Sequence, residues 1–165
     1  MTDIAQPDFT SRVPKYDFAD TLEAQEAQLE TNPMMQRFAE SRRTLASDPY
    51  RPAYHFVSPE STMNDPNGLC FWQGRWHLFY QGYPPEDPRQ HWGHAVSQDL
   101  IHWRDLPYAI YPNPERCCFS GATYVEENRV IAMYHGTEAG NMVAVSGDPL
   151  LLNWKKLTGE PVIPM

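Results

Sequence analysis

Segments typical of short β-strands recur along this chain at intervals of about 50 residues, and this repeat limits the possible folds more than any other feature. Each repeat holds four such segments, separated by Gly, Pro, Asn and Asp. Four residue pairs match in register, with offsets between 49 and 54: Ala95 and Ala144, Trp103 and Trp154, Gly68 and Gly121, and Tyr80 and Tyr134. Repeated four-stranded units are typical of β-propeller blades, and the alternative is two unrelated β-meanders. We therefore predict an all-β fold in which residues 51–165 form about two blades.

The expected strands are rich in aromatic and β-branched residues. Gln73-Gly74 and Glu127-Asn128 predict one hairpin within each blade. Strands are expected at residues 69–72, 76–80, 92–96, 102–106, 123–125, 130–134, 142–145 and 154–157.

Two blades cannot close a propeller, which needs about four to eight. Open blades leave their faces and strand edges uncovered. We therefore expect an incomplete domain that needs the rest of the propeller, a partner chain or an oligomer to complete its fold. The last residues, Pro161–Met165, are interpreted as a connection toward a further blade.

Residues 1–50 have a different character and predict an N-terminal arm followed by two helices. Residues 1–16 are interpreted as an extended arm. Asp20 or Thr21 can cap a helix over residues 22–29, and Asn32 followed by Pro33 indicates a second helix start. The second helix should end near residues 48–49 and present Met35, Phe38 and Leu45 on one face. A helical hairpin packed on the blades is the main interpretation, and a dimerisation arm is the alternative.

Composition and charge exclude several functional classes. The 165 residues carry a net charge of −8, so the basic surface of a nucleic-acid-binding protein is absent. No apolar run is long enough to cross a membrane, and no signal sequence is visible, so we expect a cytoplasmic protein.

Cysteine and histidine spacing predicts no metal site and no cofactor. Cys70, Cys117 and Cys118 fit neither a disulfide framework nor zinc-finger spacing, and they are interpreted as packing residues. His91 and His94 are three residues apart in an expected strand, where side chains alternate between faces, so they should not share a ligand.

The densest polar cluster is Met63–Gly68, with the sequence Met-Asn-Asp-Pro-Asn-Gly. These residue types are common in turns. Here, however, they precede the first strand of a blade and stand near several Trp, Tyr and His residues. A carboxylate and amides can bind sugar hydroxyls, while aromatic faces pack on a sugar ring. The cluster is therefore a candidate sugar-binding site.

The order and spacing of several motifs resemble the N-terminal part of glycoside hydrolase family 32, which includes invertases, inulinases and levanases. The resemblance covers about residues 54–165. Its motifs are His55–Glu60, Met63–Gly68, Trp76–Gln81, His91–Ser97, Asp99–Trp103, Leu106-Pro107 and Cys118–Gly121.

This resemblance implies a five-bladed β-propeller and retaining hydrolysis of β-fructofuranosidic bonds in sucrose or fructans. Asp65 would be the catalytic nucleophile that forms a fructosyl-enzyme intermediate. Asn64 and Asn67 could supply amide donors to its carboxylate, although Asn67 fits a turn role equally well. The positions that match the family's sugar contacts are Asn64, Gln81, Trp92, Phe119 and Ser120. Trp72 and Trp76 fit the blade core better than the site.

Two other catalytic elements of the family, an Arg-Asp-Pro motif and the acid/base Glu of a Glu-Cys motif, do not occur in residues 1–165. The acid/base would come from residues outside this chain. Ala122 also stands where the family usually has Ser after Phe-Ser-Gly. Alternative functions are a related propeller enzyme for another furanoside (an arabinofuranosidase or a fructosyltransferase) and a non-catalytic fructan-binding fragment.

Overall fold

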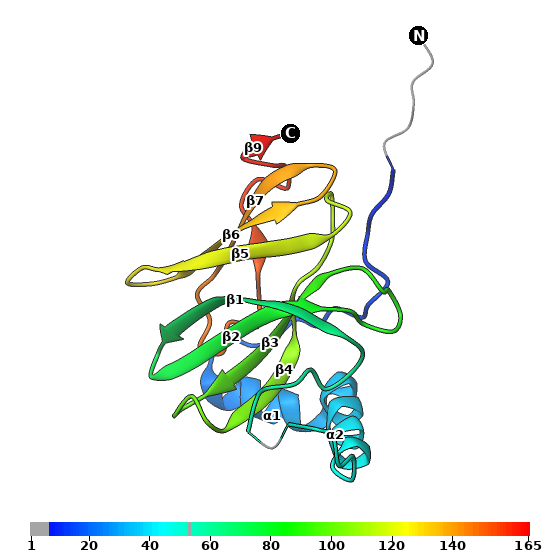
Figure 1. Ribbon diagram of the computed structural model, residues 1–165. Helices are drawn as coiled ribbons and strands as arrows, with labels where there is room; N and C mark the ends of the chain where they lie inside the picture. The colour runs from blue at the N-terminus through cyan, green and yellow to red at the C-terminus, as the bar shows by residue number, and fades with distance from the viewer. Residues whose placement is uncertain (1–6, 53) are drawn as a thin grey trace.

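The computed structural model describes residues 7–52 and 54–165 as two antiparallel β-sheets with two helices on one side (Figure 1). Sheet one has the strand order β1-β2-β3-β4 and sheet two the order β5-β6-β7-β8, with β9 added to β7. The chain order of the strands is thus kept in each sheet, as the repeat predicted. We call the two sheets blade 1 and blade 2.

Blade 1 is longer at its first strand than the sequence indicated. Its strands are β1 (Met63–Trp72), β2 (Arg75–Gly82), β3 (His91–Ser97) and β4 (Trp103–Ile110). The Met63–Gly68 cluster was expected before the first strand, but it lies within β1. Two irregularities in the β1–β2 register let these turn residues be part of a strand. The predicted hairpin is confirmed, and both Gln73 and Gly74 have positive φ, as a tight two-residue turn requires.

Blade 2 consists of β5 (Cys118–Val125), β6 (Val130–Gly136), β7 (Gly140–Ser146), β8 (Lys155–Lys156) and β9 (Ile163–Pro164). The outermost strand is interrupted: β8 pairs with one end of β7 and β9 with the other. Pro161–Met165, interpreted as a connection toward a further blade, extends the outer edge of blade 2, because Val162 and Met165 donate backbone hydrogen bonds to Asn141 and Ala139.

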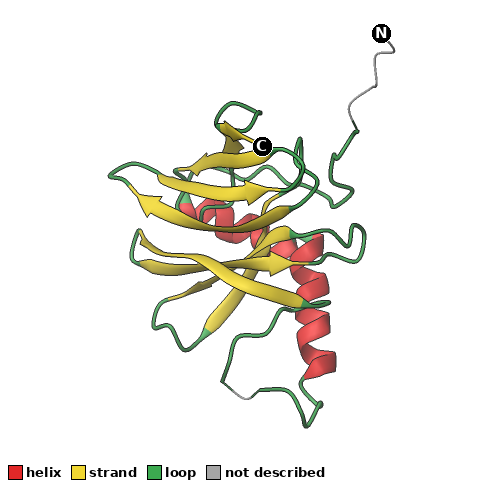
Figure 2. Cartoon of the chain, turned by 45° about the horizontal axis from the view of Figure 1, so that its top comes forward, coloured by secondary structure: helices red, strands yellow, loops and turns green. Residues whose placement is uncertain are grey.

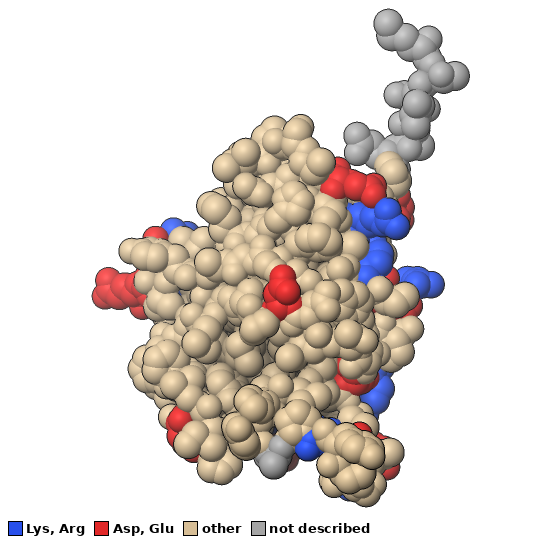
Figure 3. All heavy atoms as spheres, in the orientation of Figure 1, with Lys and Arg blue, Asp and Glu red and all other residues tan. Residues whose placement is uncertain are grey.

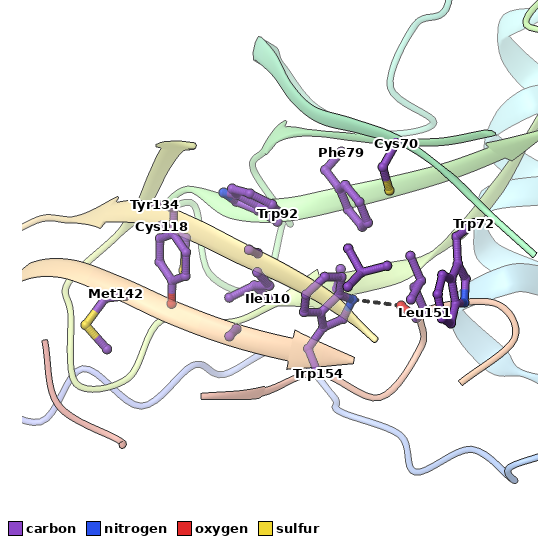
Figure 4. Close-up of a cluster of buried hydrophobic side chains, with 14 residues drawn as sticks. Cys70, Trp72, Phe79, Trp92, Ile110, Cys118, Tyr134, Met142, Leu151 and Trp154 are labelled. Atoms are coloured by element: carbon purple, nitrogen blue, oxygen red, sulfur yellow. Dashed lines mark hydrogen bonds between the residues drawn. The ribbon is translucent and has the colours of Figure 1, made fainter. Parts of the chain in front are cut away.

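The two blades pack face to face around a core of aromatic side chains. Phe79 and Trp92 from blade 1 meet Tyr134 and Trp154 from blade 2, and all four are buried (Figure 4). Trp72 is buried in the same core and Trp76 is half-buried against Phe71, so neither is fully exposed. Cys70 and Cys118 also lie in this core, which confirms their packing role.

Both predicted helices form, with the predicted N-caps. Helix α1 spans Leu22–Thr31 with Thr21 as its N-cap, and α2 spans Pro33–Leu45 with Asn32 as its N-cap. Asn32 also ends α1, so one residue joins the helices, and they meet at a steep angle instead of forming a hairpin (Figure 2). An antiparallel hairpin needs a loop of about two to five residues. Helix α2 ends before residues 48–49, and its buried face carries Met34 and Phe38, whereas Met35 and Leu45 are half-buried.

The N-terminal segment packs across both blades. Leu29 of α1 lies in one cluster with Leu106 of blade 1 and Leu150 of the loop that follows β7. Phe38 of α2 packs edge-on against Tyr108 of β4. Part of the expected arm, residues 7–16, is without helix or strand but buries Val13, while residues 1–6 lie outside the described residues. The packing therefore matches the interpretation of helices placed on the blades.

A buried glutamine fixes α1 to blade 2. Gln25 is fully buried, its Nε2 donates to Asp148 Oδ1 over 2.8 Å, and its Oε1 accepts from the Leu150 backbone N–H. On blade 1, Arg42 of α2 donates two hydrogen bonds to the carboxylate of Asp105. These polar contacts join the N-terminal segment to both blades.

Apolar side chains remain exposed on β1 and on the face of blade 2 that points away from the common core. Leu69 and Phe71 of β1 are about half exposed, and so is Met133 of β6, while Tyr124 of β5 is 68% exposed. Residues on the opposite face of each strand, such as Cys70 and Ala132, are buried between the blades. Blade 2 and the first strand of blade 1 thus keep exposed apolar side chains without a cover among the described residues, whereas α2 covers part of the outward face of blade 1 through Phe38 and Tyr108.

We predict that Gln25→Leu lowers the free energy of unfolding of the complete protein by about 1–3 kcal/mol, because the buried Leu150 N–H loses its acceptor. Urea unfolding would measure the loss. Gln36→Leu is the matched control, since Gln36 is exposed on α2, and it should change stability by less than about 0.5 kcal/mol. Equal effects of both substitutions would contradict the role given to Gln25.

We also predict that the isolated 165-residue chain is unfolded, aggregated or oligomeric, because apolar side chains of β1, β5 and β6 are exposed to water. Analytical ultracentrifugation across a range of concentrations, combined with thermal unfolding, would test this. A monomer with a sharp melting transition would contradict the prediction.

Candidate functional site

The innermost strands of the two blades, β1 and β5, lie side by side, and the candidate site is at one end of this pair. The Thr123 hydroxyl of β5 donates to the Gly68 carbonyl of β1 over 2.9 Å. Gly68 has φ +59°, and a Cβ there would lie 3.0–3.1 Å from Phe79, Thr123 and Trp92. A glycine is therefore required where β1 bends over the core.

Asp65 and Ser120 are brought together from different blades. The carboxylate of Asp65 is exposed, and the Ser120 hydroxyl donates to its Oδ2 over 2.7 Å. The Gln81 Nε2, at the end of β2, donates to the same Ser120 oxygen over 2.7 Å. Because Gln81 is buried, it fixes the Ser120 hydroxyl in one orientation. The result is a continuous hydrogen-bonded chain from Gln81 through Ser120 to the open carboxylate of Asp65.

Trp92 does not reach the surface of this site. Its side chain is fully buried in the core between the blades, and its Nε1 donates to the Phe119 carbonyl over 2.9 Å. The expectation that Trp92 contacts a sugar directly is therefore wrong for this structure, because no atom of the ring is open to a ligand. Trp92 instead supports β5 immediately before Ser120.

The two asparagines beside Asp65 do not donate to its carboxylate. Asn67 Nδ2 donates to the Asp65 backbone carbonyl, which is the turn role. Asn64 is exposed, and its Nδ2 donates to the Tyr83 hydroxyl over 2.7 Å. The donor to Asp65 is Ser120, which the sequence marked only as a sugar contact. Ser120, which is distant from Asp65 in the chain, thus supplies the hydrogen bond that we expected from Asn64 and Asn67.

Tyr83 and Gln90 are site residues that sequence reasoning missed. They flank the loop between β2 and β3, and Gln90 Nε2 donates to the Tyr83 hydroxyl over 2.9 Å. The Cys118 N–H anchors the Gln90 carbonyl to the start of β5. No motif marks either residue, because the loop between them is dominated by proline and charged residues.

Phe119 lies beside the polar chain and is half-buried, with its ring edge-on to His135. It lines a surface hollow of about 400 Å³ between the β2–β3 loop and the β6–β7 turn. Gln90, Arg116 and Glu138 line the same hollow. On the face shown in Figure 3, most charged side chains lie near the edge, and most of the surface is uncharged.

The histidines of blade 1 do not form a metal site. His91 bonds Ser11 and the Arg89 carbonyl, whereas His94 bonds His77 across the sheet. His91 and His94 therefore make hydrogen bonds to different partners. Among the residues that the structure describes, no three His, Cys, Asp or Glu side chains are grouped to hold a metal ion. No helix in the described ranges is long and apolar enough to span a membrane.

Comparison with known proteins relates residues 55–165 to a family model described as "Glycosyl hydrolases family 32 N-terminal domain". A levanase from Bacillus subtilis is 40% identical over 131 residues, which cover 70% of this chain and 19% of the levanase. A sucrose-6-phosphate hydrolase from Zymomonas mobilis is 42% identical over 113 residues, covering 66% and 21% of the two chains. The chain therefore spans about a fifth of the length of these curated relatives.

Solved structures show the same relationship. Fructan 1-exohydrolase IIa from Cichorium intybus matches with a TM-score of 0.65 and 38% identity, covering 70% of this chain and 24% of that enzyme. A β-fructofuranosidase from Bombyx mori matches with a TM-score of 0.66 and 33% identity, covering 88% and 32%. These similarities confirm the predicted propeller-type fold and the resemblance on which it was based.

We predict that the folded protein loses stability as the pH falls from about 6.5 toward 4. Burial lowers the pKa of both His77 and His91 to about 4, below the unperturbed value of 6.5. In this interval the unfolded chain binds more protons than the folded chain, so unfolding is favoured. Melting temperatures between pH 7.5 and 4.5 would show the loss.

The variant His77→Asn should reduce this pH dependence, because one buried histidine is removed. His55→Asn is the matched control, since His55 is exposed, and it should leave the pH dependence unchanged. The same slope in His77→Asn as in the unsubstituted protein would contradict the assignment.

Proposed function

The chain belongs to glycosyl hydrolase family 32, and on that premise we propose that it supplies the nucleophile of a retaining enzyme that hydrolyses β-fructofuranosidic bonds. Asp65 would attack the anomeric carbon of the fructosyl unit while the bond from that carbon to the leaving-group oxygen breaks and an acid/base carboxyl protonates that oxygen. Water, deprotonated by the same acid/base, would then cleave the covalent fructosyl-enzyme intermediate and restore the Asp65 carboxylate.

The observation that carries this proposal is the hydrogen-bonded chain from Gln81 through Ser120 to Asp65. A nucleophilic carboxylate must be open to the substrate and ionised at the working pH. Asp65 is exposed, and the hydroxyl of Ser120 donates to one of its oxygens. This hydrogen bond also fixes the orientation of the carboxylate. The other oxygen, Oδ1, is left for attack.

A retaining enzyme also needs an acid/base carboxyl about 5–5.5 Å from the nucleophile. Glu126 and Glu127 follow β5 at the end opposite Ser120, so neither is placed to serve Asp65. We infer that the acid/base Glu belongs to residues outside this chain. The exposed apolar side chains of β1, β5 and β6 support the same inference, because further blades would cover them.

The substrate class proposed for the complete protein is sucrose or a fructan. Relatives named levanase and sucrose-6-phosphate hydrolase support this class. The Cichorium fructan exohydrolase has also been solved in complex with 1-kestose. Phe119 provides an aromatic surface, and Ser120 and Asp65 provide polar groups, which together form the combination that a sugar ring requires.

We predict that Asp65→Asn in the complete enzyme lowers kcat on sucrose or levan by at least about 10³-fold, while sugar binding is largely retained. The amide keeps the shape of the side chain but cannot act as the nucleophile. Initial rates and isothermal titration with the same sugars would measure both effects. Asp20→Asn is the matched control, since Asp20 is exposed just before α1.

Near-normal turnover by the Asp65→Asn variant would rule out Asp65 as the nucleophile. Product analysis of the unsubstituted enzyme with sucrose, inulin, levan and an aryl arabinofuranoside would test the substrate class. Cleavage of the arabinofuranoside alone would contradict the proposed function.

A further inference from the structure

We propose that the hydroxyl of Tyr83 is a substrate-binding group, which donates a hydrogen bond to the leaving-group sugar of the β-fructoside. This inference rests on the proposed function and adds a specificity-determining residue to the same site.

The hydroxyl of Tyr83 already accepts two hydrogen bonds within the protein. Its phenol oxygen accepts one N–H from Asn64 over 2.7 Å and another from Gln90 over 2.9 Å. A tyrosine hydroxyl can accept two hydrogen bonds and donate one. Both acceptor positions are therefore filled, and only the O–H proton is left. Within the described ranges no side chain or carbonyl accepts it, so the hydroxyl presents a fixed donor to a ligand.

The hydroxyl of Tyr83 is placed close to both Asp65 and the hollow. Gly82, the residue before Tyr83, pairs with Met63 at the start of β1, so Tyr83 lies at the Asp65 end of blade 1. The hydroxyl bonds Asn64, the chain neighbour of Asp65, on one side. On the other side it bonds Gln90, which lines the hollow of about 400 Å³. Tyr83 thus stands between the nucleophile and the hollow.

The leaving-group sugar is the part of the substrate that passes Tyr83. The fructosyl unit must lie over Asp65, beside the Ser120 hydroxyl that Gln81 holds in place. Phe119 directly precedes Ser120 and forms part of the hollow, so a sugar attached to that fructosyl unit can extend along Phe119. Sugar hydroxyl and ring oxygens are acceptors for a phenol O–H. The geometry therefore pairs Tyr83 with the leaving-group sugar, and Asn64 and Gln90 act as its positioning residues.

The test compares Tyr83→Phe with the unsubstituted complete enzyme on three substrates: sucrose, 1-kestose and an aryl β-fructofuranoside, which has no sugar in its leaving group. We expect kcat/KM to fall about tenfold or more on sucrose and 1-kestose. On the aryl fructoside it should change by less than about twofold. Tyr50→Phe is the matched control, since Tyr50 is 93% exposed in the loop after α2, and it should behave like the unsubstituted enzyme.

A second variant, Gln90→Met, keeps the phenol but removes one of its two supports. It should show the same dependence on the leaving group with a smaller loss, and it decides the question if Tyr83→Phe does not fold. Equal losses of kcat/KM on all three substrates, or losses below twofold on sucrose and 1-kestose, would overturn the role given to Tyr83. The proposed function would not be affected by that result. An unsubstituted enzyme that cleaves none of the three, nor inulin or levan, would instead contradict the proposed function and, with it, this inference.

Discussion

The apolar packing of blade 1 against blade 2 is the interaction on which the rest of the structure depends. Phe79 and Trp92 meet Tyr134 and Trp154 in a core from which water is excluded. This contact brings β1 and β5 close enough for Ser120 to reach Asp65. Burial of large aromatic side chains contributes far more free energy than one exposed hydrogen bond. The core therefore sets the geometry, and the polar contact of the site follows from it.

The N-terminal segment strengthens the same contact from the outer edge of the blades. Leucines of α1 and of both blades form one apolar cluster, and Gln25 and Arg42 add polar bonds to blade 2 and blade 1. A relative rotation of the blades would break these bonds as well as the central core. The N-terminal helices and the central core thus both hold the blades in the arrangement that places Ser120 beside Asp65.

The exposed groups of the site are held by buried side chains that hydrogen-bond to them or to their neighbours in the chain. Trp92 is buried and holds the Phe119 carbonyl, while Gln81 is buried and holds Ser120. Asp65 and Asn64 are exposed to solvent, and Tyr83 is half-buried. A preorganised arrangement of this kind lowers the cost of placing a substrate at the nucleophile. Trp92, one of the positions expected to contact the sugar, contributes to this arrangement as a structural support.

Local sequence determined the elements of this protein, because their causes are local. Thr21, Asn32 and Pro33 mark the helix starts, and Gln73-Gly74 marks a hairpin through its positive φ angles. The 50-residue repeat determined the two blades, and the motifs around Asp65 determined the family. Tertiary structure decided which side chains meet. Ser120 donates to Asp65 across 55 positions of the chain, Gln25 bonds Asp148 across 123, and Tyr83 lies between Asn64 and Gln90. These contacts depend on how the sheets pack, and no spacing within a strand or loop encodes a distance between two blades.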